Sequence, residues 1–359
     1  MEGKKNILFG VLNWGLGHAT RSIPVINNLL KLGYSPIIAS DGVALDYLKK
    51  EFPDLIFEEL PSYRIRYKFE NLLLQSLYLA PKISSAIRKE QKDLQILVKK
   101  HRAIAVISDN RLGFYCKEIP SAYISHQNKI IAGFPFSTAN WIHHYFIKKF
   151  NQFWIPDFEK QPGLSGKLGH SKKRHPKTKY IGPLSRFSKY AFSPKQKVYD
   201  VLVLLSGPEP QRSLLEKMLF DQLKHWQGKF LIIRGKEGGL PEKNENIEIK
   251  NLVLSHELPD LILKSKMVIS RSGYSSLMDY YFLKNQALLI PTPGQTEQVY
   301  LAEKCKSEGS FYSVNQDKLD LKNDLVKAKE YSGFQEGNEA KKDFLPSVLL
   351  DFLQSEGKS

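Results

Sequence analysis

The chain has 359 residues, 42% of them hydrophobic and 25% charged, which is the composition of a soluble globular protein long enough for two domains. Two cysteines, Cys116 and Cys305, are too few for a disulfide framework and lack the spacing of metal ligands, so they indicate a reducing cytoplasm. The longest apolar runs have the length of strands, which predicts no membrane-spanning helix, and the N-terminal run is interpreted as a first strand instead of a signal peptide.

The net charge of +16 is concentrated in the first half of the chain. Residues 1–190 hold 30 of the 53 lysines and arginines and 14 of the 37 acidic residues. The second half therefore holds 23 basic and 23 acidic residues and has no net charge. A basic domain beside a neutral one predicts an anionic partner for the first. Nucleic acid, an anionic membrane surface and a phosphorylated substrate all fit, as does a basic surface that only promotes solubility.

Apolar runs of strand length alternate with helical patterns through both halves. In the first half we expect strands at 6–12, 35–40, 104–110 and 121–127, and helices at 20–33 and 41–52. The second half is expected to form strands at 200–207, 230–235, 267–273 and 287–293, and helices at 213–226, 256–265 and 274–285. This alternation predicts an α/β protein with two Rossmann-like domains, each a doubly wound parallel sheet.

The predicted domains are residues 1–185 and 186–340. The boundary is placed after the basic, glycine-rich segment 162–179, which has the composition of a linker or loop. Residues 341–359 include the amphipathic "DFLPSVLLDFLQ", which we expect to be a helix that packs back on the first domain.

The first predicted strand runs into Asn13, Gly15, Gly17 and His18. Glycines allow a tight turn and close approach to a ligand, and a helix N-terminus after them favours an oxyanion. His18 would lie beside that anion, where imidazole can act as a base near neutral pH. The spacing is that of neither a dinucleotide-binding nor a Walker loop, which disfavours NAD and ATP. A turn that only reverses the chain is the alternative.

The second half contains "SRSGYSSLMDYYFLKNQALLIPTPGQTEQ". Its Arg271-Ser272-Gly273 turn ends a strand and opens a helix, which is a second geometry for binding an anion. The Asp279 carboxylate in that helix can accept two hydrogen bonds from a ribose diol, and Glu297 and Gln298 can bond sugar hydroxyls. Individually they fit a surface charge at Arg271, a solvated helix residue at Asp279 and a loop cap at Gln298. Together they predict a nucleotide-sugar cleft.

The chain resembles glycosyltransferase family 28, which includes the peptidoglycan N-acetylglucosaminyl transferase. The resemblance rests on the two-domain layout, the Gly-x-Gly-His turn, "YIGPLSR" and the "SRSG…D…PTPGQTEQ" block. It implies the GT-B fold, with two domains facing across a cleft that closes over the donor. It also implies inverting transfer of a sugar from a nucleotide donor, a UDP-sugar, with no metal ion and no cofactor.

The resemblance places the donor in the second domain. Asp279 matches the ribose-binding acid, which is usually Glu, and Gln298 matches a contact to the donor sugar. The stretch 255–258 matches the one that reads the base through its backbone. The expected donor-binding residues are Ser206, Gly207, Arg234, Ser255, His256, Leu258, Arg271, Ser272, Gly273, Asp279, Glu297 and Gln298.

On the acceptor side, "SHQN" resembles the family's His-Glu-Gln-Asn loop with the Glu missing. The expected acceptor-side residues are Asn13, Gly15, Gly17, Asp109, His126, Gln127 and Asn128. We expect His18 to be the catalytic base, with Asp109 as the alternative, and Arg271 with helix N-termini to stabilise the leaving diphosphate.

Two loops depart from the family pattern. Trp14 stands where small residues are usual, and "SGPEPQ" has two prolines that remove N–H donors and an acid, Glu209, that repels phosphate. These departures point away from the peptidoglycan intermediate as the acceptor.

The basic first domain predicts an anionic or lipid-linked acceptor, or docking on an anionic membrane surface. Residues 63–83 and 140–156 mix aromatic and basic side chains as interfacial helices do, although a core helix with a basic face is the favoured interpretation of 137–150. The predicted location is the cytoplasm, with peripheral attachment to the inner membrane face. The alternatives are a nucleotide-sugar epimerase of the same fold and a basic nucleic-acid- or membrane-binding protein without catalysis, but no nucleic-acid module is recognised.

Overall fold

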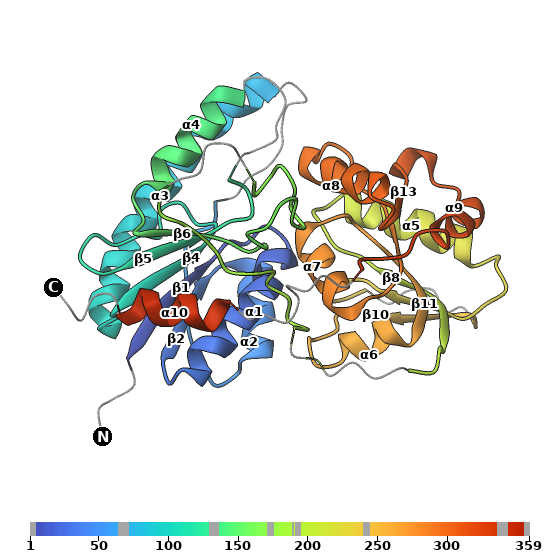
Figure 1. Ribbon diagram of the computed structural model, residues 1–359, viewed down its shortest axis with the longest axis horizontal. Coiled ribbons are helices and arrows are strands. Elements are labelled where there is room, and N and C mark those ends of the chain that lie inside the picture. Colours follow the sequence, from blue (N-terminus) through green and yellow to red (C-terminus); the bar gives the residue numbers. More distant parts are fainter. Residues whose placement is uncertain are drawn as a thin grey trace. The chain divides into compact units, whose positions relative to one another are not determined.

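The structure, a computed structural model, describes residues 5–63, 72–128, 136–170, 176–188, 190, 195–239, 245–335 and 344–354. The chain forms two compact units, each built around one β-sheet (Figure 1). The first unit comprises Met1–Trp14, Arg21–Leu184 and Glu339–Ser359, and the second comprises Gly15–Thr20 and Ser185–Asn338.

The first sheet has the strand order β3-β2-β1-β4-β5-β6-β7, and each neighbouring pair is parallel. Its strands are β1 (Asn6–Val11), β2 (Ser35–Ser40), β3 (Ile56–Glu59), β4 (Ala105–Asp109), β5 (Ser121–Ile124), β6 (Gln152–Ile155) and β7 (Thr178–Tyr180). The helices are α1 (Leu16–Lys31), α2 (Gly42–Glu51), α3 (Leu72–His101), α4 (Phe136–Ile147) and α10 (Leu345–Gln354). Strands β1, β2 and β4 are nearly continuous runs of buried residues, as expected for a parallel sheet covered on both faces.

The second sheet has the order β10-β9-β8-β11-β12-β13, again with parallel pairs. Its strands are β8 (Tyr199–Leu204), β9 (Phe230–Ile233), β10 (Ile247–Lys250), β11 (Ser265–Ser270), β12 (Ala287–Leu289) and β13 (Tyr312–Ser313). The helices are α5 (Gln211–Leu223), α6 (Leu258–Leu263), α7 (Tyr274–Leu283), α8 (Thr296–Ser307) and α9 (Leu321–Ala328), with the short 3₁₀ helix η1 (Gln316–Lys318). One apolar cluster joins β8, β9 and β11 to α5 and α9.

The predicted fold class is confirmed. In each unit the order reverses beside the first strand, between β1 and β4 and between β8 and β11. At such a switch point the loops at the carboxyl ends of the strands diverge and leave room for a ligand. Within the first unit, Phe352 of α10 packs edge-on against Trp154 of β6, with ring centroids 5.2 Å apart.

Helix α1 begins at Leu16, four residues earlier than the sequence predicted. Gly17 and His18 therefore lie in its first turn and not in a loop before it, while Gly15, at φ +73°, precedes the helix. Pro24 lies inside α1 and has no N–H, so the carbonyl of Thr20 lacks its helical hydrogen bond.

Candidate functional site

The predicted donor-binding residues gather at one edge of the second sheet. Because the strand pairs of this sheet are parallel, the loops after β8, β9, β10, β11 and β12 leave from the same edge. These loops and the helix starts that follow them hold the predicted residues, apart from Asp279, which lies further along α7. The turns 206–207 and 271–273 flank the switch point between β8 and β11.

Arg271 is a buried cation, 1% exposed, so its interpretation as a surface charge is wrong. Its guanidinium donates to the carbonyls of Ile290 and Pro291, each at 3.3 Å, and to that of Gln211 at 2.8 Å. Among the described residues no carboxylate pairs with Arg271, and its Nε has no hydrogen-bond partner. Burial lowers the pKa of Arg271 to about 10, so its charge is held at a cost that a bound anion would reduce.

Ser272 and Gly273 lie between Arg271 and α7. The Ser272 hydroxyl donates to the backbone carbonyl of Gln298 at 2.8 Å and so ties this turn to α8. Gly273 is the N-cap of α7, and a side chain built there would meet no heavy atom within 4 Å beyond its chain neighbours. Gly273 thus leaves space beside the start of α7, and the first N–H groups of a helix lack helical acceptors.

Gln298 holds the loop after β12 together. Its Oε1 accepts a hydrogen bond from the Thr292 N–H at 2.9 Å, and its Nε2 donates to Gln295 Oε1 at 2.6 Å. The side chain thus caps the loop, which is the alternative that the sequence left open, and its contact with a donor sugar stays a prediction. Glu297, in the first turn of α8, is half-buried.

Asp279 is buried, 7% exposed, and not solvated as its alternative interpretation required. One carboxylate oxygen accepts a hydrogen bond from Ser185 Oγ at 2.6 Å, and the other pairs with Arg186 Nε at 3.3 Å. Burial raises the pKa of Asp279, and Arg186 and Ser185 act in the opposite direction. Both partners belong to "YIGPLSR", so this acid anchors that segment to α7, and its bond to a ribose stays a prediction.

The Ser206-Gly207 turn follows β8. Gly207 has φ +102°, a conformation that favours glycine. Glu209 forms an ion pair with Arg212 at 2.7 Å and accepts hydrogen bonds from the Ser213 N–H and hydroxyl. The expectation that Glu209 repels phosphate needs correction, because the adjacent guanidinium offsets its charge.

Arg234, after β9, also has protein partners. It pairs with Glu216, and it donates to Asn251 Oδ1 at 3.0 Å and to two glycine carbonyls of its own loop. It therefore organises the loops after β9 and β10. In the stretch expected to read the base, His256 is exposed and Leu258, the first residue of α6, is buried. Ser255 is half-buried in the turn before them.

In the first unit, Asn13 follows β1 and bridges to α2. Its Nδ2 donates to Asp41 at 3.1 Å, and its Oδ1 accepts from the Ala44 N–H at 3.4 Å. Trp14 beside it is 43% exposed. Asn13 therefore holds the start of α2 against the end of β1. A contact between Asn13 and an acceptor substrate would have to use the hydrogen-bonding capacity that these two bonds do not take up.

Asp109, at the end of β4, is fully buried. Arg21 of α1 binds both carboxylate oxygens, through Nε at 2.8 Å and through a second, shorter contact from Nη2. Arg21 Nη1 lies 2.9 Å from His126 Nδ1, just after β5. A guanidinium can only donate, so His126 Nδ1 accepts and the ring proton lies on Nε2. Asp109 is thus an ion-pair partner, a role that the sequence reasoning did not assign to it.

His126 begins the predicted acceptor-side loop. Gln127 follows, and its N–H donates to Ser125 Oγ at 3.2 Å. Asn128 is fully buried. The loop thus leaves β5 at the same sheet edge as Asn13 and Asp109 leave β1 and β4.

Sequence reasoning missed a second buried network beside this edge. Arg111 is fully buried, pairs with Glu90 and with Asp41 at 2.8 Å, and donates to the carbonyl of Pro61 at 2.8 Å. Glu90 also accepts from the Tyr63 hydroxyl at 2.6 Å. Burial alone would lower the pKa of Arg111, but Glu90, Tyr63 and Asp41 together outweigh burial and raise that pKa. The sequence signal was "SDNR", in which Arg111 follows a strand end; Glu90 in mid-helix gave none.

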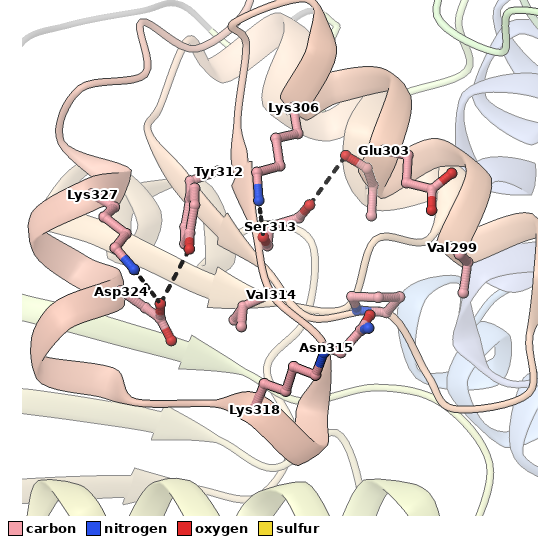
Figure 2. A pocket seen from close by; sticks show the side chains of 12 residues that line it. Val299, Glu303, Lys306, Tyr312, Ser313, Val314, Asn315, Lys318, Asp324 and Lys327 are labelled. Atoms are coloured by element: carbon pink, nitrogen blue, oxygen red, sulfur yellow. Dashed lines mark hydrogen bonds and ion pairs between the residues drawn. The ribbon is translucent and has the colours of Figure 1, made fainter.

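A cavity of about 410 Å³ lies elsewhere in the second unit, lined by α8, β13, η1 and α9 (Figure 2). The Tyr312 hydroxyl there donates to Asp324 at 3.3 Å, and Lys306 lies over the Tyr312 ring, 4.6 Å from its centre. None of the predicted site residues lines this cavity. In the part of the chain that the structure describes, no cluster of His, Cys, Asp and Glu suits a metal ion, and no helix is long and apolar enough to cross a bilayer.

Two Rossmann-like units with the same strand order define the GT-B class of glycosyltransferase folds. Solved structures share it at low sequence identity. The calicheamicin glycosyltransferase CalG4 has a TM-score of 0.66 at 11% identity, over 99% of this chain and 98% of that one. MurG of Acinetobacter baumannii has a TM-score of 0.55 at 14% identity, over 98% and 100%.

The family profile described as "Glycosyl transferase family 1" matches residues 5–329, and the chain belongs to that family. Two curated relatives are named UDP-N-acetylglucosamine–N-acetylmuramyl-(pentapeptide) pyrophosphoryl-undecaprenol N-acetylglucosamine transferase. The enzyme of Sulfurihydrogenibium sp. (strain YO3AOP1) is 25% identical, over 94% of this chain and 96% of its own length. The enzyme of Clostridium tetani is also 25% identical, over 89% and 87%. The predicted resemblance to the peptidoglycan transferases is confirmed, and this protein is a glycosyltransferase.

Proposed function

We propose that this glycosyltransferase moves a sugar from a UDP-sugar to a lipid-linked or otherwise anionic acceptor, with inversion and without a metal ion. The observation that carries the proposal is the arrangement at the edge of the second sheet. Five loops and the helices that follow them hold the predicted donor residues there, and one loop contains the buried Arg271, which has no carboxylate partner among the described residues. The names of the curated relatives supply the UDP-sugar and the lipid-linked acceptor.

The donor diphosphate fits this edge on electrostatic grounds. Helices α7 and α8 begin at Tyr274 and Thr296, directly after loops at the edge, and their first N–H groups favour an oxyanion. Arg271 adds a full positive charge in a site of low dielectric, where it acts strongly on charge that develops on the leaving group. A fixed guanidinium and oriented N–H groups would supply what a bound metal supplies in other transferases.

Recognition of the ribose by Asp279 remains part of the proposal. An ionised carboxylate offers about four lone-pair sites, and Ser185 and Arg186 use two of them. The remaining two lone-pair sites suit the two hydroxyls of a diol. The side chain of Asp is one carbon shorter than that of Glu, and the fixed position of the anchored carboxylate compensates for this difference.

For the acceptor we propose His18 as the base, in the first turn of α1, and His126 as a hydrogen-bond donor through Nε2–H. Asp109 is the weaker candidate for the base, because Arg21 already binds both of its oxygens. His126 cannot serve as a base through Nδ1 while that atom accepts from Arg21.

We further propose that the basic first unit attaches to the cytoplasmic membrane face. Tyr145 of α4 is 48% exposed, and Lys149 lies 4.8 Å from the centre of its ring, a pairing suited to a headgroup layer. Most of segment 63–83, the other predicted interfacial stretch, lies outside the residues whose side chains the structure describes.

Calorimetric titration of UDP and of a short duplex DNA at two salt concentrations tests the class of ligand. We expect UDP to bind with weak dependence on salt, whereas a nucleic-acid binder would lose DNA affinity steeply as salt rises. Incubation with UDP-N-acetylglucosamine and an undecaprenyl-pyrophosphoryl acceptor should then yield a glycosylated lipid. Epimerised nucleotide sugar formed without any acceptor would support the epimerase alternative, and failure to bind UDP would overturn the proposal.

A further inference from the structure

Thr292 lies in the loop after β12 and is 1% exposed. Its backbone N–H donates to Gln298 Oε1, which fixes the loop, but its hydroxyl has no hydrogen-bond partner among the described residues. Burial of a hydroxyl without a hydrogen-bond partner costs free energy. We therefore expect a bound ligand to supply the partner that the free protein lacks.

The space beside this hydroxyl is left open by a glycine from the neighbouring loop. A side chain built on Gly207, after β8, would place its first carbon 3.7 Å from Thr292 Oγ1. No other heavy atom beyond the chain neighbours of Gly207 lies within 4 Å of that point. A ligand atom there, about 1 Å closer to the oxygen, would be at hydrogen-bond distance.

The surroundings of this space favour an oxygen that carries negative charge. Arg271 donates to the carbonyls of Ile290 and Pro291, the two residues just before Thr292, and its Nε is likewise without a partner. A neutral ligand group would leave the charge of Arg271 uncompensated, whereas a phosphate oxygen would offset it.

We propose that the Thr292 hydroxyl donates a hydrogen bond to a phosphate oxygen of the bound nucleoside diphosphate, in the space beside Gly207. This inference rests on the proposed function and adds a binding residue to it. Nothing in the sequence singled out Thr292, because a threonine between two prolines in "IPTPG" has the pattern of an ordinary loop.

The test compares Thr292→Val, which replaces the hydroxyl with a methyl group of similar size, with Thr292→Ser, which keeps the hydroxyl. Calorimetry gives the Kd for UDP and for uridine, which has no phosphate, and thermal unfolding gives the Tm of the ligand-free proteins. We expect Thr292→Val to bind UDP about tenfold more weakly, equivalent to about 1.4 kcal/mol, with unchanged affinity for uridine. Thr292→Ser should bind UDP nearly as well as the wild type.

The stability of the free protein provides an independent readout. Because the hydroxyl is unpaired when no ligand is bound, Thr292→Val should leave the Tm unchanged or raise it. A fall of about 3 °C or more would mean that the hydroxyl is already satisfied, and it would overturn the inference. Equal UDP affinity in Thr292→Val and wild type, or equal loss for UDP and uridine, would also overturn it while leaving the proposed function intact. A wild type that does not bind UDP would overturn both.

Discussion

Asp109→Asn separates a structural role of this acid from a catalytic one. The substitution removes the negative charge that pairs with the buried Arg21 guanidinium, and loss of one partner from a buried ion pair costs about 3–5 kcal/mol. For a domain of this size each kcal/mol lowers the Tm by about 2–4 °C, so we expect a fall of about 6–20 °C. The double variant Arg21→Met, Asp109→Leu should recover most of that loss, because an apolar pair of similar volume removes both charges together.

Thermal unfolding and urea titration of the two variants measure these changes. The matched control is Asp46→Asn, which removes an exposed carboxylate from α2 and should change the stability by about 0.5 kcal/mol or less. If Asp109→Asn keeps the wild-type Tm and yet abolishes sugar transfer, then the ion pair is energetically unimportant. Asp109 would in that case replace His18 as the candidate base.

Three further outcomes are expected. His18→Ala should lower the rate of transfer by about 10²–10⁴ and leave the Kd for UDP within about twofold; a change in rate below threefold would exclude His18 as the base. Asp279→Ala should abolish the rise in Tm that UDP causes, and an undiminished rise would count against the ribose contact. Burial lowers the pKa of His143 to about 3 in the folded protein. As the pH falls, this residue therefore gains a proton at a higher pH in the unfolded chain than in the folded one. Stability is therefore lost as pH falls below about 6.5, and between pH 7 and pH 5 His143→Phe should lose about 2 kcal/mol less than the wild type in urea titrations.

The fold could be predicted from sequence because its central strands carry strong local signals. Strands β1, β2, β8 and β9 are short apolar runs bounded by loops, and the structure forms them close to the predicted positions. Edge strands such as β3 and β7 were not predicted, because their residues are partly exposed and their hydrophobic pattern is weak. The start of α1 was misplaced because glycines were taken to end a strand, whereas here Gly17 lies inside the first helical turn.

The candidate site could be located from sequence, but its contacts could not. Motif order placed Arg271 at a strand end and Asp279 in the helix that follows, and the parallel sheet brings the strand ends to one edge. Their partners, the carbonyl of Gln211 for one and Ser185 for the other, are 60 and 94 positions away in the chain. No local sequence pattern encodes such pairings. The ion pair between Glu209 and Arg212 could not be predicted from a local pattern either.

Pro24 gives α1 two mechanical parts. Because this residue has no N–H to donate, the turn that carries His18 lacks one of the bonds that would tie it to the rest of the helix. The part of α1 before Pro24 can therefore tilt by a small amount at little cost relative to the part that follows. Backbone amides before the proline should therefore exchange with deuterium faster than those after it. The His18 imidazole can then shift slightly in position together with its helical turn.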